Sequence, residues 1–421
     1  MRILMVAQFY PPIVGGVERH VHSLATALAA RGHSVAVATL WHSGLPEFEV
    51  DQGVNIYRVH GTVQRFGALF TVERQHAPPF PDPEVLLALR RIIAIERPEI
   101  VHAHNWMIHS FLPLKAWSRA RLVMTLHNCE VTCAQMRFMY RDTELCSGPR
   151  LTKCLDCTAH HYGTVKGTGI LFGNSTMSRF ERTAVDMFLP VSRAIADANR
   201  LTHAPAHFQV VPNFVPDDVA DVNDDADPRL SQLPSEDFVL QVGDLVPDKG
   251  INVLLEAYRR LPSAPPLVLI GRRLSTSPRE LPPNVTLIEG LPHDLVMRAW
   301  RRSLFGTVPS TCLDASPTVT LEAMCSGRPV IGSQIGGIQD QIVDGETGFL
   351  VPPGDREALG RAMERLIMDP ALRARMGQAA KHRAKQFQAS TIVSRIEAIY
   401  TALVQPARAA AFPQTNIIDW Q

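Results

Sequence analysis

The sequence has almost no net charge and no long apolar run. Its 42 Lys and Arg residues balance 41 Asp and Glu residues, which leaves a formal charge of +1 and no footprint of nucleic-acid binding. The apolar stretches, such as residues 266–270, have the length of a strand and not of a membrane span. The opening MRILMVAQFYPP has a short apolar run without a small-residue cleavage site after it, so we expect a first strand there and not a signal peptide.

Two further absences narrow the class of protein. The dinucleotide fingerprint G-x-G-x-x-G is missing, which argues against a nicotinamide or flavin enzyme. Residues 211–237 are rich in Asp and Pro but lack the Gly that an EF-hand loop needs, so a solvated linker is favoured there. We also find no short tandem repeat.

What is present indicates two domains. The chain has 421 residues, of which 46% are hydrophobic and 20% charged, as in ordinary globular proteins. Strand-like runs (3–9, 34–40) alternate with helical ones (17–30, 84–96), and the rhythm restarts near Phe238. Alternation of this kind predicts parallel sheets with helices on both faces. We therefore expect an α/β protein with two doubly wound Rossmann-like domains facing a cleft.

The expected domain boundaries follow from this rhythm. Residues 1–205 form the first domain, which carries a Cys-rich insertion at about 129–157. Residues 206–388 form the second domain. A C-terminal helix at about 389–404 is expected to pack back onto the first domain. In open sheets of this type, ligands bind at the carboxyl ends of the strands.

The stretch PSTCLDASPTVTLEAMCSGRPVIG (309–332) carries two acids in apolar surroundings. Ser316 stands where an N-cap belongs, Pro317 would be the first helical residue, and Gly327 follows the helix. Asp314 falls in the loop, and Glu322 lies inside the helix, where a buried carboxylate needs a partner. A pair of ligand hydroxyls, a nearby Arg or a backbone cap are the alternatives.

Other candidate residues lie at predicted strand ends or helix starts. Gly15 and Gly16 precede a helix and either approach a ligand oxygen or form only a tight turn. Lys249 precedes another helix and is either a phosphate-binding cation or a surface residue. His127 follows one predicted strand, and His102 and His104 end another. They either contact substrate or make structural hydrogen bonds.

Five of the seven cysteines fall between residues 129 and 157. Four of them have the spacing C-x12-C-x7-C-x2-C, namely Cys133, Cys146, Cys154 and Cys157. Four thiolates suffice for a closed tetrahedral zinc site, which would be structural because no coordination position stays open. Buried free thiols and redox-active pairs are the alternatives.

Several segments, taken in order, resemble family 4 of the retaining glycosyltransferases, which have the GT-B fold. They are PPIVGGVERHV, VHAHNW, TLHN, VVPNF, VGDLVPDKGINVLLEAYRRL, DASPTVTLEAM and GRPVIGSQIGGIQDQIVDGETGFLVPPGD, and they span nearly the whole chain. The resemblance implies transfer of a sugar from a nucleoside diphosphate to an acceptor with retained anomeric configuration. It also implies no active-site metal, because helix N-termini and cations hold the diphosphate.

The resemblance also implies roles for particular residues. His127 and Asp314 are expected beside the reacting sugar, and Glu322 is expected on the ribose hydroxyls. The remaining donor-binding residues are expected to be Gly15, Gly16, Lys249, Arg272, Arg273, Ser316 and Thr318.

Two positions depart from the family pattern. The first acid is usually Glu, and Asp314 is one methylene shorter. The family Arg that precedes the Lys is replaced by Asp244, which removes a charge that the leaving diphosphate would use. The hypothesis is that Arg272 and Arg273, just after the next strand, take its place.

The implied partners are a nucleotide-sugar donor, with UDP or GDP as the first choices, and a saccharide, lipid-linked or small-molecule acceptor. We expect a cytoplasmic enzyme of polysaccharide or glycoconjugate synthesis, which a lipid-linked acceptor would bring to the inner face of the membrane. Residues 65–83 and the cysteine insertion are expected to choose the acceptor. The rival interpretations are a GT-B epimerase or phosphorylase and a catalytically weakened nucleotide-sugar-binding protein.

Overall fold

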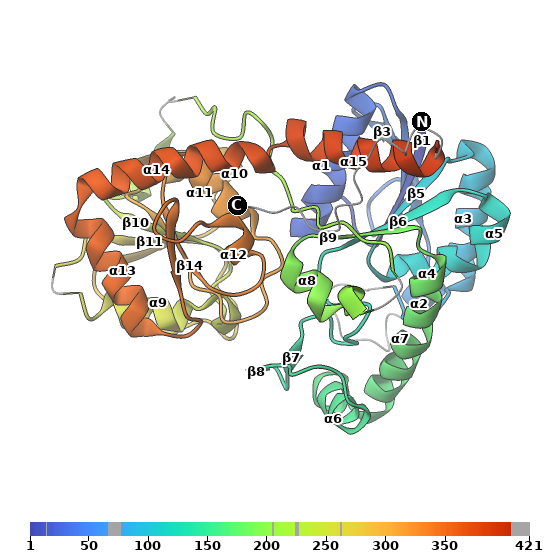
Figure 1. Ribbon diagram of the computed structural model, residues 1–421, viewed down its shortest axis with the longest axis horizontal. Coiled ribbons are helices and arrows are strands. Elements are labelled where there is room, and N and C mark those ends of the chain that lie inside the picture. The colour runs from blue at the N-terminus through green and yellow to red at the C-terminus, as the bar shows by residue number, and fades with distance from the viewer. Residues whose placement is uncertain (14, 66–76, 204–205, 224–226, 262, 406–421) are drawn as a thin grey trace. The chain divides into compact units, whose positions relative to one another are not determined.

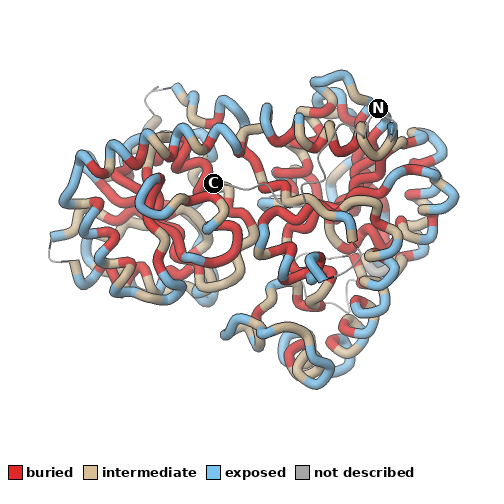
Figure 2. The backbone as a smooth tube through the Cα atoms, in the orientation of Figure 1, coloured by how far each residue is buried: buried red, intermediate tan, exposed pale blue. Residues whose placement is uncertain are grey.

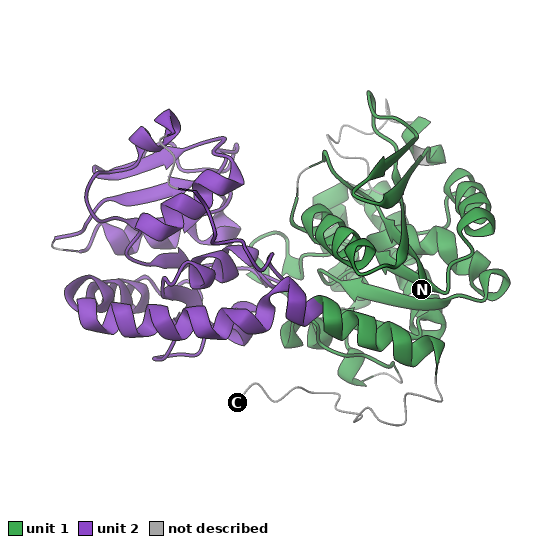
Figure 3. Ribbon diagram, turned by 90° about the horizontal axis from the view of Figure 1, so that it is seen from above, with its two compact units in different colours: residues 1–211, 393–421 green, residues 212–392 purple. Residues whose placement is uncertain are grey.

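A computed structural model describes residues 1–13, 15–65, 77–203, 206–223, 227–261 and 263–405 (Figure 1). The chain divides into two compact units: unit 1 comprises Met1–Val211 and Val393–Gln421, and unit 2 comprises Pro212–Ile392 (Figure 3). The predicted boundary after residue 205 falls on a residue outside the described ranges. Each unit is an α/β layer structure, and the predicted fold class is confirmed.

Unit 1 contains a seven-stranded sheet in the order β3-β4-β2-β1-β5-β6-β9. All its neighbouring strands are parallel except β3, which runs antiparallel to β4. Nearly every residue of β1 and β6 is buried, as expected for parallel strands covered on both faces. The strands are β1 (Arg2–Ala7), β2 (Ser34–Leu40), β3 (Phe48–Asp51), β4 (Val54–Val59), β5 (Ile100–His104), β6 (Arg121–Leu126) and β9 (Met187–Pro190).

The helices of unit 1 begin at the residues that local chemistry favours. The Asp82 carboxylate caps α3 by accepting hydrogen bonds from the Glu84 and Val85 N–H groups, and Pro83 is its first residue. The helices are α1 (Gly16–Ala30), α2 (Thr62–Arg65), α3 (Pro83–Glu96), α4 (Ile108–Phe111), α5 (Lys115–Ser118), α6 (Leu151–Tyr162), α7 (Thr164–Ala184) and α8 (Arg193–Ala198).

The segment after β6 has a structure that the sequence pattern did not predict. It contains the short hairpin β7 (Met139–Tyr140) and β8 (Glu144–Leu145). Helices α6 and α7 follow and lie side by side (Figure 1). The cysteines of the predicted insertion belong to this hairpin and its flanking loops, and to α6.

Unit 2 contains a six-stranded, all-parallel sheet in the order β12-β11-β10-β13-β14-β15. Most of its strands form the buried centre of the unit, whereas the edge strand β12 is only partly buried (Figure 2). The strands are β10 (Val239–Val242), β11 (Leu267–Ile270), β12 (Val285–Ile288), β13 (Gly306–Val308), β14 (Val330–Ser333) and β15 (Gly348–Val351).

Most helices of unit 2 alternate with its strands, as the predicted rhythm indicates. Helix α9 follows β10 and ends at Tyr258. The helices are α9 (Ile251–Tyr258), α10 (His293–Arg302), α11 (Thr318–Cys325), α12 (Ile338–Gln341), α13 (Arg356–Met368) and α14 (Pro370–Ala384), and α15 (Ala389–Val404) starts in unit 2 and ends in unit 1. The 3₁₀ turns are Asn105–Met107, Leu112–Leu114, Leu201–His203, Pro228–Gln232, Pro247–Lys249 and Lys385–Phe387.

Each sheet has a point where the strand order reverses. In unit 1 the reversal lies between β1 and β5, and in unit 2 between β10 and β13. Loops that leave two such strands in opposite directions open a crevice at their carboxyl ends, which is the usual ligand site of these sheets. Across the described ranges, no helix combines the length and apolarity that a bilayer crossing requires.

Candidate functional site

At the reversal point of unit 2, Lys249 and Asp314 form an ion pair. Lys249 Nζ lies 2.6 Å from Asp314 Oδ2, and the Ser310 hydroxyl donates to the same oxygen at 2.9 Å. Burial lowers the pKa of the Lys249 ammonium, but the attraction of Asp314 outweighs it and the net shift is upward. The two residues that the sequence assigned to the phosphate and to the sugar therefore stand together, with Lys249 charged.

Close backbone contacts hold the loops that carry this pair. A Cβ on Gly250, which has φ +71°, would lie 1.8 Å from the Pro309 carbonyl oxygen. A Cβ on Gly336, with φ +59°, would lie 2.0 Å from the Asp314 carbonyl oxygen. Because only glycine fits at both positions, the loops after β10, β13 and β14 pack directly against one another.

Glu322 lies on α11, and only 6% of its side chain is exposed. Its Oε1 accepts a hydrogen bond from His293 Nε2 at 2.9 Å. Its Oε2 is buried and has no hydrogen-bond partner among the described residues. The sequence left a ligand, an Arg or a backbone cap open as the partner of Glu322. The structure supplies a histidine for one oxygen and, among the described residues, no partner for the other.

The predicted N-cap at Ser316 is wrong. Helix α11 starts at Thr318 with Pro317 at the cap position, and no side chain caps it. The Ser316 hydroxyl instead accepts hydrogen bonds from the Asn213 N–H at 3.3 Å and from Gln341 Nε2 at 3.2 Å. Ser316 ties its loop to neighbouring segments, so the first N–H groups of α11 lack a side-chain cap.

Asp244 and Arg272 form a bidentate ion pair. Arg272 Nε lies 2.9 Å from Oδ1 and a terminal nitrogen lies 2.6 Å from Oδ2. The Arg272 hydrogen bonds hold the pKa of Asp244 below its usual value. The Arg273 guanidinium instead donates to the Pro278 and Arg279 carbonyls, each at 3.0 Å. Of the two predicted substitutes, Arg272 alone contacts Asp244.

At the reversal point of unit 1, buried histidines surround His127. Its Nε2 lies 3.0 Å from His104 Nδ1, and the His20 ring packs edge-on at 4.8 Å. Burial lowers the pKa of His20 to about 4 and holds that of His104 well below its usual value. His127 therefore sits against imidazoles that stay neutral at neutral pH.

His102 has a structural role. It lies in the middle of β5, and its two nitrogens bond to Tyr400 at 2.6 Å and to Thr125 at 2.7 Å. Burial lowers its pKa to about 3. Of the alternatives raised for the strand-end histidines, internal hydrogen bonding applies to His102, which anchors α15 to the sheet.

Gly15 and Gly16 precede and begin α1, as the sequence indicated. Gly15 is extended, with φ −173°, and no side chain caps the helix. The carboxylate of Glu18, an acid in the first turn, folds back over Gly15. An anion approaching this helix end would have to displace that carboxylate or share the N–H groups with it.

The four candidate cysteines line one small cavity of about 30 Å³. All seven cysteines of the chain are free thiols. Within the described ranges, no group of three or more His, Cys, Asp or Glu side chains stands ready to hold a metal ion. The structure thus gathers Cys133, Cys146, Cys154 and Cys157 without arranging them around an ion.

Sequence reasoning missed His20, His293 and Tyr400. The sequence does contain a pattern that indicates a buried His20, since this residue shares the buried stripe of α1 with Leu24 and Leu28 at a spacing of four. No local pattern indicates the roles of His293 and Tyr400, because their partners lie 29 and 298 residues away.

Comparisons with known proteins cover both units. The family model described as "Glycosyltransferase Family 4" matches residues 14–219, and that described as "Glycosyl transferases group 1" matches residues 224–383. A glycogen synthase of Mycobacterium tuberculosis is 27% identical over 431 residues, which cover 96% of this chain and 95% of that protein.

Two solved structures show the same fold. Sucrose-phosphate synthase from Thermosynechococcus elongatus aligns with a TM-score of 0.71 at 21% identity, over 98% of this chain and 100% of that one. Anabaena Alr3699/HepE in complex with UDP and glucose aligns with a TM-score of 0.68 at 18% identity, over 96% and 100%.

Proposed function

Because this chain belongs to glycosyltransferase group 1/family 4 and transfers a sugar from a nucleotide sugar, we propose that Glu322 is the anchor of its donor. The observation that carries this proposal is Glu322 Oε2, which is buried and finds no hydrogen-bond partner in the described part of the chain. A carboxylate oxygen left without a partner is costly, and a pair of ribose hydroxyls would satisfy it.

The neighbouring groups suit the rest of the donor. Lys249 supplies a charged ammonium for the diphosphate, and the uncapped N–H groups at Thr318 favour an anion. The Arg272 guanidinium is held beside Asp244 and provides the charge that the family Arg would provide. Asp314, released from Lys249 by the diphosphate, is then available to the hydroxyls of the transferred sugar. Ser316 contributes through its position in the loop.

The reaction proposed for this site retains the anomeric configuration. The bond between the sugar C1 and the diphosphate oxygen breaks, and a bond from C1 to the acceptor oxygen forms on the same face. The proton of the acceptor hydroxyl passes to the departing diphosphate. Lys249 and the α11 N–H groups stabilise the charge that develops on the leaving group. His127, kept in place by His104, hydrogen-bonds a hydroxyl of the reacting sugar, and no step requires a metal.

UDP is the first candidate for the nucleotide, with GDP second. Alr3699/HepE has been crystallised with UDP and with UDP-glucose, and starch synthase IV of Arabidopsis thaliana with ADP and acarbose. A saccharide or a lipid-linked sugar is the proposed acceptor, which would place the enzyme in the cytoplasm or at the inner membrane face. The expected acceptor region 65–83 includes residues 66–76, which are outside the described ranges.

Thermal unfolding with UDP, GDP, ADP and NAD tests the donor site. A ligand at a hundred times its Kd stabilises a protein by about 2.7 kcal/mol, which is a shift of several degrees in a chain of this size. We expect one nucleoside diphosphate to shift the wild type and to shift Glu322→Gln much less. Glu256→Gln is the matched control, because Glu256 lies in the same unit in an exposed pair with Arg356.

Two results would contradict the proposal. If no diphosphate stabilises the wild type, the substitution at Asp244 is uncompensated and a weakened binding protein is favoured. If Glu322→Gln responds like Glu256→Gln, the donor binds elsewhere.

A further inference from the structure

The segment between β6 and α6 has little regular structure to hold it together. Its two strands contain two residues each. Met136, Phe138, Arg141 and Asp142 all have φ between +50° and +66°, a conformation that costs energy for residues other than glycine. A small loop-rich module of this kind usually depends on a crosslink for its stability.

Four cysteines line one cavity where such a crosslink would lie. Cys133 belongs to a loop, Cys146 follows β8, and Cys154 and Cys157 lie on α6, yet all four line the same cavity. Its volume of about 30 Å³ is large enough for a single small ion or a water molecule. Apolar side chains, among them Met139 and Leu171, complete the wall.

Backbone N–H groups already point at two of the sulfurs. The Cys133 sulfur is hydrogen-bonded by the N–H groups of Gln135 and Phe138. The Cys157 sulfur accepts a bond from the Arg141 N–H at 3.5 Å. These bonds hold two of the four sulfurs, although burial outweighs them and raises the pKa of both thiols.

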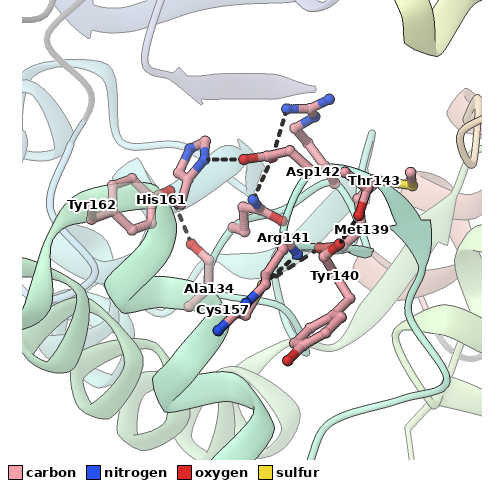
Figure 4. Close-up of polar contacts among 11 residues, drawn as sticks. Ala134, Met139, Tyr140, Arg141, Asp142, Thr143, Cys157, His161 and Tyr162 are labelled. Carbon is pink, nitrogen blue, oxygen red and sulfur yellow. Dashed lines mark hydrogen bonds and ion pairs between the residues drawn. The ribbon is translucent and has the colours of Figure 1, made fainter.

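Polar contacts hold the surrounding loops in place (Figure 4). His161 Nδ1 lies 3.2 Å from Asp142, and the Tyr162 hydroxyl donates to the Ala134 carbonyl at 3.2 Å. Asp156 accepts bonds from the Tyr140 hydroxyl at 2.7 Å and from Arg141 Nε at 2.8 Å. The hairpin is thereby fastened to α6 on both sides of Cys157.

We propose that Cys133, Cys146, Cys154 and Cys157 bind one Zn²⁺ ion as four thiolates and that this ion is the crosslink of the module. Zinc binding requires that rotations about the one side-chain torsion of each cysteine bring all four sulfurs to roughly 2.3 Å from the ion. Binding releases four thiol protons to solvent, and no oxidation occurs. Lys153, which also lines the cavity, offsets part of the resulting negative charge. With four protein ligands the ion is structural, and the proposal does not depend on glycosyl transfer.

Elemental analysis of the full chain, purified under reducing conditions, tests the site. We expect one equivalent of zinc per chain in the wild type and a loss to background in Cys133→Ser and in Cys157→Ser. Cys129→Ala is the matched control, because Cys129 is buried in the same segment but does not line the cavity. It should keep its zinc.

A second measurement covers variants that fail to fold. The wild type, stripped of metal and loaded with Co²⁺, should show the absorption of tetrahedral cobalt thiolate, and one equivalent of Zn²⁺ should remove that absorption. Metal-free wild type that neither binds Co²⁺ in this form nor gains thermal stability from Zn²⁺ overturns the proposal. So do bound iron in place of zinc, intact disulfides among the four residues, and equal zinc in the Cys157→Ser and Cys129→Ala proteins.

Discussion

His293 Nε2 lies 2.9 Å from one carboxylate oxygen of Glu322, a residue that is itself almost wholly buried. The contact fixes the rotation of the carboxylate, and the other oxygen has no hydrogen-bond partner among the described residues. Because 40% of the His293 side chain is exposed, the pair links the surface of unit 2 to its interior.

Removing this histidine should weaken nucleotide binding. In His293→Ala the carboxylate loses its orienting partner, and hydrogen bonds to charged groups contribute about 1.5–3 kcal/mol. We expect the Kd of the stabilising nucleoside diphosphate, measured by calorimetry, to rise about tenfold or more. His382→Ala, an exposed histidine of the same unit, should leave the Kd unchanged. Equal affinities in the two variants would show that His293 does not act through Glu322.

Lys249 should distinguish a diphosphate from a monophosphate. If the Lys249 ammonium turns from Asp314 to the diphosphate, the Lys249→Met variant should bind the nucleoside diphosphate about tenfold more weakly than the wild type does. Its loss of affinity for the nucleoside monophosphate should be smaller. Lys381→Met, a substitution of an exposed lysine on α14, is the control. An equal loss for both nucleotides would mean that Lys249 serves only to hold Asp314.

Arg272 should supply the positive charge that is missing because Asp244 stands in place of the family Arg. We expect Arg272→Glu to abolish donor binding, while Asp244→Asn, which removes the opposing carboxylate charge, leaves the Kd unchanged or lower. Arg273→Ala is the comparison, because that guanidinium is used by the Pro278 and Arg279 carbonyls. Wild-type binding by Arg272→Glu would refute the hypothesis.

The buried histidines should make unit 1 sensitive to acid. His20 has a pKa of about 4 in the folded protein and an ordinary value of 6.5 when unfolded, so the unfolded chain binds more protons between these values. Stability is therefore complete above pH 6.5 and falls as the pH drops toward 4, by roughly 3 kcal/mol for His20. Thermal unfolding from pH 5 to 8 should show this slope, and His20→Leu should reduce it, while His102 and His104 still contribute. A profile as steep as that of the wild type would place the sensitivity elsewhere.

Tyr400 should stabilise unit 1 through His102. Tyr400→Phe removes the hydroxyl that lies 2.6 Å from His102 Nδ1 and leaves a buried nitrogen unpaired. The expected cost is about 1–3 kcal/mol, which lowers the Tm by several degrees. Thr401→Ala is the neighbouring control, since its hydroxyl bonds only within α15. A Tm equal to that of the control would rule out this anchoring role.

Much of the fold could be predicted because its signals are local. The apolar runs of β1, β2 and β11 and the helical spacing of α1 depend on a few consecutive residues, and alternation of the two predicts parallel sheets. The segment from β7 to α7 escaped prediction because it has short strands and several positive φ values that no residue type announces.

For the candidate site, the identity of its residues could be predicted from the sequence, but their contacts could not. Asp314, Glu322, Lys249 and His127 could be selected from motif order, since each follows a strand or lies on the helix after one. What each side chain touches could not be predicted. The Ser316 hydroxyl accepts hydrogen bonds from Asn213 and Gln341 and does not cap α11, because those two residues reach it only in the folded unit.

The sequence by itself determined which residues end the strands and which family they belong to, because periodicity and motif order lie along the chain. Only the tertiary structure decided how those residues pair. Asp244 meets Arg272 across 28 residues, and Cys133 shares a cavity with Cys157. Such pairings depend on strand order and on close loop packing, which are set by the burial of the whole sheet and not by any single segment.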